Sequence, residues 1–355
     1  TGETVATSPV YDSAQGLAWT PSGDEVWSSS PLGIGQIHAL GLGGQTRNVL
    51  TVPGRIWLRD IASDGRLLVQ QGIARRGMIV SLNSGQQERD VSWLDFGYLR
   101  DFSNDGKTIL FEEEGGSAPT YTLLVRNVDG SPAVPIGEGY GLALSPDKNW
   151  ALGEKLIEPN HEIWLFPIGP GEPRRMSPPE LTPQITAGFF PDGKRIFYPA
   201  SEHGSPPRVW VQDISGGPPH AITAENVFGW RISPDGKWLL AGRRVSVNTL
   251  LDGTLVSVEN GTVEPVKGIR TDESILGWTR ENEIYVRSVP DPTRMMIHVD
   301  KLNPFTGART AWRDLAMPPI GGVRPDAPII TPDGSSFAFD YRMNLSDLYT
   351  VSGVR

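Results

Sequence analysis

The sequence predicts an all-β protein, an eight-bladed β-propeller of four-stranded antiparallel blades that uses all 355 residues as a single domain. Three observations lead to this fold class. A hairpin signature recurs along the chain at intervals of 41 to 52 residues, which is the period of propeller blades. Glycine (41 residues) and proline (31 residues) are frequent, and in a chain with regular apolar runs they indicate many turns. The hydrophobic content of 38% is sufficient for a large core.

The clearest copy of the hairpin is Trp230–Arg243, which reads W-R-I-S-P-D-G-K-W-L-L-A-G-R. In its turn, proline sets φ near about −65°, aspartate accepts hydrogen bonds from nearby N–H groups, and glycine adopts a positive φ. The other copies, in chain order, read L-A-W-T-P-S-G-D-E-V-W, R-D-I-A-S-D-G-R-L-L-V, R-D-F-S-N-D-G-K-T-I-L-F, G-L-A-L-S-P-D-K-N-W-A-L, G-F-F-P-D-G-K-R-I-F-Y, L-G-W-T-R-E-N-E-I-Y-V and I-I-T-P-D-G-S-S-F-A-F-D-Y. The glycine position of the eight turns is occupied by Gly23, Gly65, Gly106, Lys148, Gly193, Gly236, Asn282 and Gly334.

Each repeat is expected to form four strands, with this turn between the first and the second. In the first repeat, Leu17–Thr20 and Glu25–Ser29 flank the turn, and Gln36–Leu42 and Arg47–Val52 follow it. The same assignment along the chain gives blades at residues 17–53, 56–93, 98–139, 141–179, 185–224, 227–269, 275–316 and 326–353.

The two ends of the chain are expected to complete one blade together. The eighth repeat has three strands, and Glu3–Ser8 has no partner in its own repeat. We therefore expect the N-terminal strand, within residues 1–9, to pair with the outer edge of the eighth blade and close the ring. Closure of a propeller protects strand edges that would otherwise promote aggregation.

Aligning the hairpins gives two columns of residues with different roles. The first column is large and apolar and is expected to pack between blades: Trp19, Ile61, Phe102, Leu144, Phe189, Ile232, Trp278 and Ile330. The second column, one residue earlier, is mixed: Ala18, Asp60, Asp101, Ala143, Gly188, Arg231, Gly277 and Ile329. Unpaired charges are costly in a dry core, so the charged members are expected to lie near the channel mouth or to bond across blades.

Composition excludes several classes of function. The net charge of −9 argues against nucleic-acid binding, which depends on Lys and Arg contacts with phosphates. The absence of cysteine excludes thiol catalysis, disulfides and cysteine-ligated metals. The sequence begins at Thr1 and contains neither a signal peptide nor about 18 continuous apolar residues, so we expect a piece of a longer protein.

The hairpin array resembles the TolB-type, WD40-like propellers. Two longer stretches, Phe111–Asp147 and Leu345–Arg355, are similar to the C-terminal propellers of bacterial, especially acidobacterial, eukaryotic-like serine/threonine kinases. The resemblance extends over essentially the whole chain. It implies an extracytoplasmic domain, periplasmic or at the cell surface, whose contact with a membrane comes through the parent chain.

Short motifs of kinases and hydrolases are explained by the repeats. Asp95-Phe96-Gly97 precedes the glycine-rich Gly137–Gly141, the reverse of the kinase order, and no H-R-D loop is present. A G-x-S-x-G elbow is absent, and the S-x-x-K match Ser145–Lys148 is the fourth copy of the turn. We expect no catalytic residue, no cofactor and no metal. The five histidines lack ligand spacing, and Glu112–Glu114 is left open as a calcium site against the commoner solvated acidic loop.

Charged residues of the innermost strands are the candidate binding site. They are expected at a channel mouth surrounded by the variable loops between second and third strands, opposite the S-P-D-G turns. The candidate residues are Trp57, Arg59, Asp60, Arg100, Asp101, Trp230 and Arg231. Convergent charges with aromatic walls suit a small polar ligand or a peptide end. The alternative is that these charges only stabilise the channel.

The function expected from these observations is that of a non-catalytic sensor or binding domain in a receptor-type bacterial serine/threonine kinase. Its partner would be a small polar ligand, a peptide or a protein. Two alternatives remain open: a free periplasmic TolB-like protein-interaction scaffold, and the propeller half of a prolyl-oligopeptidase-like serine peptidase.

Overall fold

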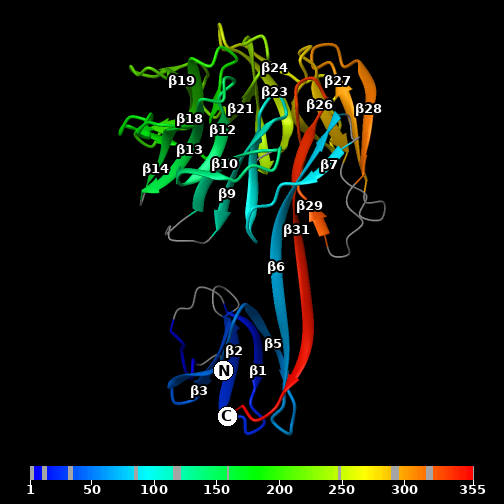
Figure 1. Cartoon of the computed structure of the whole chain (residues 1–355). Helices are drawn as coiled ribbons and strands as arrows, with labels where there is room; N and C mark the ends of the chain where they lie inside the picture. Colours follow the sequence, from blue (N-terminus) through cyan, green and yellow to red (C-terminus); the bar gives the residue numbers. More distant parts are fainter. Residues whose placement is uncertain are drawn as a thin grey trace. The chain divides into compact units, whose positions relative to one another are not determined.

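The structure is a computed structural model that describes residues 4–9, 14–30, 35–83, 87–114, 121–157, 160–246, 249–288, 296–316 and 323–354. Within these ranges the chain forms strands β1 to β31 and no α-helix, which confirms the all-β class (Figure 1). The chain divides into two compact units. Unit 1 contains Thr1–Arg75 and Met343–Arg355, and unit 2 contains Arg76–Arg342.

Unit 1 is built on one four-stranded antiparallel sheet and a second, shorter set of strands. The sheet follows chain order: β1 (Gln15–Trp19), β2 (Glu25–Ser30), β3 (Gly35–Gly41) and β4 (Thr46–Val52). Strand β5 (Arg55–Ile61) pairs with the first part of β6 (Leu67–Leu82). Apolar side chains of both sets form one buried cluster, which includes Trp27, Ile37, Leu58 and Val69.

The described strands of unit 2 form six blades. Five of them follow chain order. The first contains β8 (Gly97–Phe102), β9 (Thr108–Glu114), β10 (Tyr121–Asn127) and β11 (Val134–Glu138). The second contains β12 (Tyr140–Leu144), β13 (Trp150–Ile157), β14 (Asn160–Pro167) and β15 (Arg174–Arg175). The third contains β16 (Leu181–Pro183), β17 (Gly188–Phe189), β18 (Arg195–Glu202), β19 (Arg208–Asp213) and β20 (His220–Ala221).

The fourth blade contains β21 (Gly229–Ile232), β22 (Trp238–Ser246), β23 (Thr249–Ser257) and β24 (Val263–Pro265). The fifth contains β25 (Glu273–Trp278), β26 (Ile284–Ser288), β27 (Met296–Leu302) and β28 (Arg309–Ala316). These two blades are joined into one sheet where β23 pairs with β25 at Leu250 and Ile275.

The sixth blade combines strands from distant parts of the sequence. Its inner pieces β29 (Val323–Pro325) and β30 (Ile329–Ile330) pair with β31 (Phe337–Val351), β31 pairs with β6, and β6 pairs with β7 (Gln87–Asp90). Strands β6 and β31 therefore contribute residues to both units.

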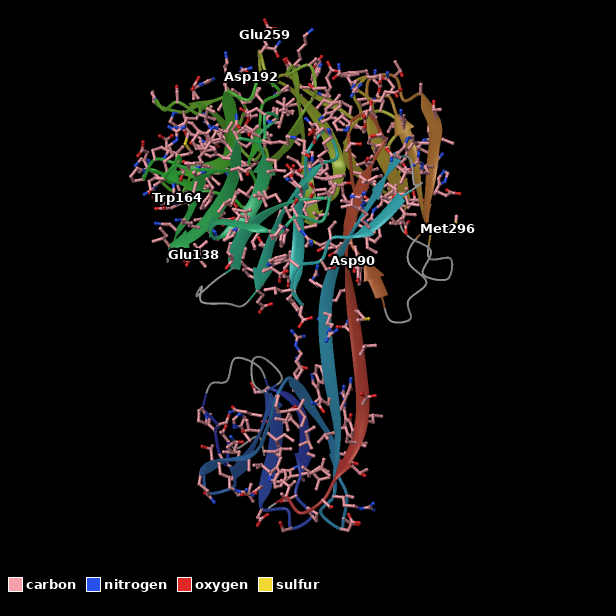
Figure 2. The ribbon with its side chains drawn as sticks, in the orientation of Figure 1. Asp90, Glu138, Trp164, Asp192, Glu259 and Met296 are labelled. Atoms are coloured by element: carbon pink, nitrogen blue, oxygen red, sulfur yellow. The ribbon has the colours of Figure 1, made fainter. Side chains whose placement is uncertain are left out.

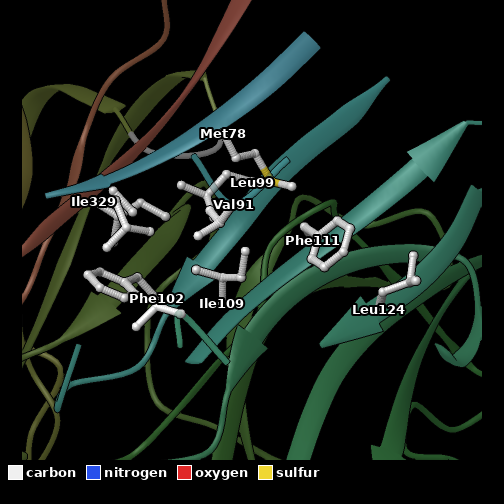
Figure 3. Close-up of a cluster of buried hydrophobic side chains, with 11 residues drawn as sticks. Met78, Val91, Leu99, Phe102, Ile109, Phe111, Leu124 and Ile329 are labelled. Atoms are coloured by element: carbon white, nitrogen blue, oxygen red, sulfur yellow. The ribbon is translucent and has the colours of Figure 1, made fainter. Parts of the chain in front are cut away.

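Six hydrophobic clusters link the six blades of unit 2 in a cycle. The first cluster joins the β30–β31–β6–β7 blade to the β8–β11 blade and contains Met78, Leu99, Phe102 and Ile329 (Figure 3). Four further clusters join each following pair of blades in chain order. The sixth cluster packs Leu276 and Tyr285 of the β25–β28 blade against Phe337 and Phe339 of β31, which returns to the starting blade.

The turns of the repeat have the chemistry expected from the sequence. Ser233 donates from Oγ to Asp235 at 2.6 Å, Asp235 accepts from the Lys237 N–H at 3.1 Å, and the Gly236 N–H donates to the Ser233 carbonyl at 2.9 Å. The predicted positive φ is present at Gly236 (74°) and also at Lys148 and Asn282 (each 60°), which replace glycine in their repeats.

The apolar column packs between blades in unit 2, as predicted. Phe102, Leu144, Trp278 and Ile330 are buried, and Phe189 and Ile232 are partly buried against the clusters. In unit 1, Ile61 is partly buried, but the prediction is wrong for Trp19, which is 56% exposed. The core of unit 1 lies on the other side of β1, where Ala18 is buried, so Trp19 points away from it.

The structure differs from the predicted single domain of eight blades. Residues 71–76 and 341–346, between the second and third strands expected of the second and eighth repeats, are interior parts of the long strands β6 and β31. Each of these strands replaces two shorter ones, so the second and eighth repeats are divided between the units and do not form blades of their own. The proposed closing strand is not confirmed, because residues 4–9 form no strand; β31 pairs with β6, and β6 pairs with β7.

Candidate functional site

Unit 2 contains a cavity of about 430 Å³ at the turn end of its inner strands. The lining comes from β8, β12, β17, β21, β25 and β30 and from the turns that follow them, including Asn104 and Pro234. Asp192, in one of these turns, lies at one end of unit 2, whereas Glu138 and Met296 lie toward the other end (Figure 2). The cavity is therefore at the end with the S-P-D-G turns, and not at the end with the variable loops where the sequence analysis expected the site.

A β-bulge at a repeated position directs side chains toward this cavity. The strand register shifts between Leu99 and Asp101 in β8, and equivalent shifts occur in β12, β21 and β25. An extra residue in a strand changes which face the following side chains occupy. Six members of the mixed column line the cavity: Asp101, Ala143, Gly188, Arg231, Gly277 and Ile329. Its charged members in unit 2, Asp101 and Arg231, thus line a cavity, and the repeated bulge is a feature that sequence reasoning missed.

Asp101 connects three blades. Its Oδ2 accepts a hydrogen bond from the Leu144 N–H of β12 at 2.8 Å, and its Oδ1 lies 3.8 Å from Nη1 of Arg231 on β21. Burial raises the pKa of Asp101, while the charge of Arg231 and the N–H groups of Leu144 and Phe102 act to lower it. The carboxylate thus bonds across blades, as the sequence analysis expected of charges in this column.

Arg231 combines a charged group with aromatic surroundings. Its guanidinium carbon lies 5.1 Å from the centroid of the Trp230 ring, and its side chain is 30% exposed. The buried Nε of Arg231 has no hydrogen-bond acceptor among the described residues. Trp278 donates from Nε1 to the Arg231 carbonyl at 3.3 Å, so both tryptophans are fixed beside this residue. The cavity therefore holds a cation whose capacity to donate hydrogen bonds is only partly used.

Arg100, one of the predicted site residues, does not line the cavity. Its guanidinium donates to the fully buried Glu112 of β9, and the same carboxylate accepts from the Gly141 N–H of β12 at 2.9 Å. Burial raises the pKa of Glu112, and Arg100 opposes this shift. Arg100 therefore neutralises a buried carboxylate of its own blade, and that carboxylate links the blade to the next one.

The three candidates on β5 belong to unit 1. Trp57 donates from Nε1 to Gln15 at 2.7 Å, Arg59 donates from Nε to Gln70 at 3.0 Å, and Asp60 accepts from the Ile61 N–H at 2.9 Å. None of them is part of the lining of the cavity in unit 2. The predicted set of seven thus divides: Asp101, Trp230 and Arg231 line one cavity, and the other four do not.

A second group of charges in unit 2 was not predicted. Arg76 on β6 donates to Asp340 of β31 at 2.7 Å and to Asp326 at 2.9 Å, and its guanidinium carbon lies 4.1 Å from the Tyr98 ring centroid. Burial and the neighbouring charge of Asp326 raise the pKa of Asp340 to about 7, although Arg76 lowers it. Sequence spacing could not reveal this group, because Arg76 is more than 200 residues from Asp326 and Asp340 along the chain.

The remaining motifs have structural contacts. Glu113 accepts hydrogen bonds from the N–H groups of Leu94 and Phe96 at 3.0 and 3.3 Å, so the carboxylates of Glu112 and Glu113 both bind protein donors. Ser145 donates from Oγ to Asp147 at 2.6 Å, the same contact as in the other turns. In the part of the chain that the structure describes, no group of acidic, histidine or cysteine residues has metal-binding geometry. That part also contains no helix able to span a membrane.

Comparison with known proteins connects the fold to solved structures. No protein-family model matches the sequence, and no curated protein matches it. A protein described as TolB from Agrobacterium tumefaciens is similar with a TM-score of 0.53 and 20% identity over 76% of this chain and 99% of its own. An oligogalacturonate lyase in complex with manganese has a TM-score of 0.48 at 15% identity, covering 80% and 77%. TolB from Acinetobacter baumannii has a TM-score of 0.44 at 12% identity, covering 89% and 78%.

The chain has a β-propeller fold of the TolB-like type. This assignment is based on the Agrobacterium protein, whose TM-score exceeds 0.5, and it agrees with the blades and the repeated hairpin described above. At 20% identity the similarity defines the fold and not the activity.

Proposed function

We propose that this chain is a non-catalytic binding domain, and that the cavity of unit 2 accepts a small polar ligand or the end of a peptide or protein partner. The observation that supports this most directly is Arg231, a cation at a cavity of about 430 Å³ whose side chain is 30% exposed and whose Nη1 lies 3.8 Å from Asp101, beyond hydrogen-bond distance. Ligand sites are typically concave and largely apolar, with a few convergent polar groups that set orientation. This cavity is concave and combines apolar side chains with three charged ones, Asp101, Arg231 and Arg280.

The same proposal is compatible with each parent protein considered from the sequence. We favour the extracytoplasmic sensor domain of a membrane-anchored bacterial serine/threonine kinase, on the resemblance of Phe111–Asp147 and Leu345–Arg355. A free periplasmic scaffold and the propeller half of a serine peptidase are the alternatives. The reading frame around Thr1 and Arg355 separates them. A kinase and one membrane helix upstream support the first, a signal peptide the second, and a downstream hydrolase domain the third.

A ligand screen that compares the parent chain with a variant of narrowed cavity tests the binding function. Small acids, amines, sugars and short peptides would be screened by ligand-detected NMR against the parent chain and against Asn104→Trp. Asn104 is an exposed turn residue on the lining, so a tryptophan there narrows the cavity without entering the core.

The matched control is Ser63→Trp, which places the same side chain at the equivalent exposed turn position in unit 1. Ligands of the cavity should lose their signal with Asn104→Trp and keep it with Ser63→Trp. Ligands whose binding signal is the same with both variants, or a screen that finds no ligand, would contradict the proposed function.

A further inference from the structure

The charge balance of the cavity indicates the class of ligand. Its lining contains two cations, Arg231 and Arg280, and one carboxylate, Asp101. Arg280 is 69% exposed, and its Nη2 lies 3.7 Å from Asp333, a separation longer than a hydrogen bond. Asp101 Oδ1 is also beyond hydrogen-bond distance from Nη1 of Arg231, at 3.8 Å. Both guanidinium groups can therefore donate to an added acceptor.

Asp101 is less available to a ligand than the two cations. It is buried and already accepts the Leu144 N–H at 2.8 Å, so its carboxyl group interacts with the protein and not with an added ligand. An anion that enters the cavity leaves water, and a singly charged carboxylate loses less hydration than a doubly charged phosphate. A guanidinium binds either group through paired hydrogen bonds, so the lower desolvation cost makes the carboxylate the better match for two arginines among apolar side chains.

Apolar side chains occupy most of the remaining lining. Trp230, Trp278, Phe189 and Leu142 come from four different inner strands or their ends, and Trp278 is held by its hydrogen bond to the Arg231 carbonyl. The volume of about 430 Å³ is in the lower part of the range for ligand pockets. The net charge of −9 on the chain also disfavours long polyanions, which would meet repulsion outside the cavity.

We propose that the cavity binds a carboxylate attached to an apolar group, with the carboxylate at Arg231 and Arg280 and the apolar group among the aromatic side chains. This inference rests on the proposed binding function and narrows it. The same chemistry occurs at the C-terminus of a peptide with an apolar last residue and in a free aromatic acid. The experiment has a separate arm for each source.

Calorimetric titration of the full chain provides the test. The probes are an N-acetylated tripeptide ending in leucine as the free acid, the same tripeptide as the C-terminal amide, phenylacetate, and phenyl phosphate. We expect the acid to bind at least about tenfold more tightly than the amide, since a hydrogen bond to a charged group contributes at least that much. Tight binding of phenylacetate but not of the peptide acid would assign the site to a small acid.

Three arginine variants connect the affinity to the cavity. Arg231→Gln should weaken acid binding by about tenfold or more, and the exposed Arg280→Gln by about two- to fivefold. Arg208→Gln is the control, because Arg208 is an exposed arginine paired with Glu225 at 3.1 Å and is not part of the lining. Circular dichroism melting verifies that each variant is folded, and Arg231→Lys provides a second variant that retains the charge without the planar fork.

Equal affinity for acid and amide, tighter binding of phenyl phosphate, or equal effects of Arg231→Gln and Arg208→Gln would overturn the inference. The two proposals fail in different ways. An uncharged ligand that is lost with Asn104→Trp and retained with Ser63→Trp would leave the binding function intact and refute the carboxylate. The absence of any cavity-dependent ligand would refute both.

Discussion

Arg100 and Asp101 are neighbours in β8 but have different contacts. The β-bulge between Leu99 and Asp101 shifts the strand register, so the two side chains point to different surroundings. Asp101 lines the cavity, whereas Arg100 contacts Glu112, which is completely buried. A buried carboxylate without its cation is strongly destabilising, since its desolvation is no longer compensated. At the residue scale, this contact supports for Arg100 the alternative that charges of the inner strands stabilise the channel.

Replacement of Arg100 should lower stability more than replacement of an exposed arginine. Arg100→Ala is expected to cost about 3 kcal/mol, because Glu112 then stays buried without its cation. Denaturant unfolding monitored by circular dichroism measures the change. Arg208→Ala, which removes an exposed ion pair with Glu225, should cost less than about 1 kcal/mol. Similar losses in the two variants would show that Arg100 is not a structural residue.

Asp340 should make stability depend on pH. Burial and Asp326 raise the pKa of Asp340 in the folded state from 3.8 to about 7. At a pH between these two values, the folded state therefore binds a proton that the unfolded state does not. Stability from this group is therefore present at low pH and is lost as pH rises toward 7.

The melting temperature of the parent chain should decrease between about pH 4 and pH 7 because of Asp340. In Asp340→Asn this decrease should be absent, because the amide stays neutral at every pH. Thermal melts at several pH values give the comparison. Parallel pH profiles for the two proteins would contradict the assignment to Asp340.

At the element scale, local chemistry was predictable and strand continuity was not. The S-P-D-G turns, their hydrogen bonds and the two alignment columns follow from short-range sequence, and the structure contains them. The long strands β6 and β31 do not follow from it. Residues 72–76 and 342–346 contain no proline, so they fit either a loop or a continuous strand, and pairing between β6 and β31 decides the outcome.

The turn after β25 contains a position that can be improved. Asn282 has a φ of 60°, and its buried Oδ1 has no hydrogen-bond partner among the described residues. Glycine adopts this backbone conformation without strain and removes the unsatisfied oxygen, so Asn282→Gly should stabilise the protein by about 1 kcal/mol. Thermal melting measures this, with an expected rise of about 2–4 °C.

The control for this prediction is Asn104→Gly, at an exposed position of another repeat turn that is not among the positive-φ residues. There, glycine only increases the freedom of the unfolded chain, and the variant should be neutral or less stable. A gain in both variants, or in neither, would remove the backbone explanation.

At the scale of the whole molecule, the number of hairpins does not determine the number of blades. Eight copies of the hairpin are present, but unit 2 uses six inner strands, and β1 and β5 belong to unit 1. The sequence could show the periodicity, but not which outer strands would join which inner ones. That choice depends on contacts between residues far apart in the chain, such as Ile329 and Met78 in one cluster. The candidate site was predictable only in part for the same reason, since Arg59 and Asp60 have the same sequence pattern as Arg100 and Asp101.

The cycle of clusters predicts that Arg76–Arg342 folds by itself. All six clusters that link the blades lie within this range, and the closing blade is completed there by β6 and β7 beside β31. A chain of residues 76–342 should therefore be monomeric and unfold in one cooperative transition.

A shorter chain of residues 97–342 lacks β6 and β7, which removes Met78, Val80 and Val91 from the first cluster and exposes the edge of β31. It should melt at least about 5 °C lower and form oligomers, because open strand edges recruit other chains. Size-exclusion chromatography and circular dichroism compare the two, and equal behaviour would mean that β6 and β7 do not complete the ring.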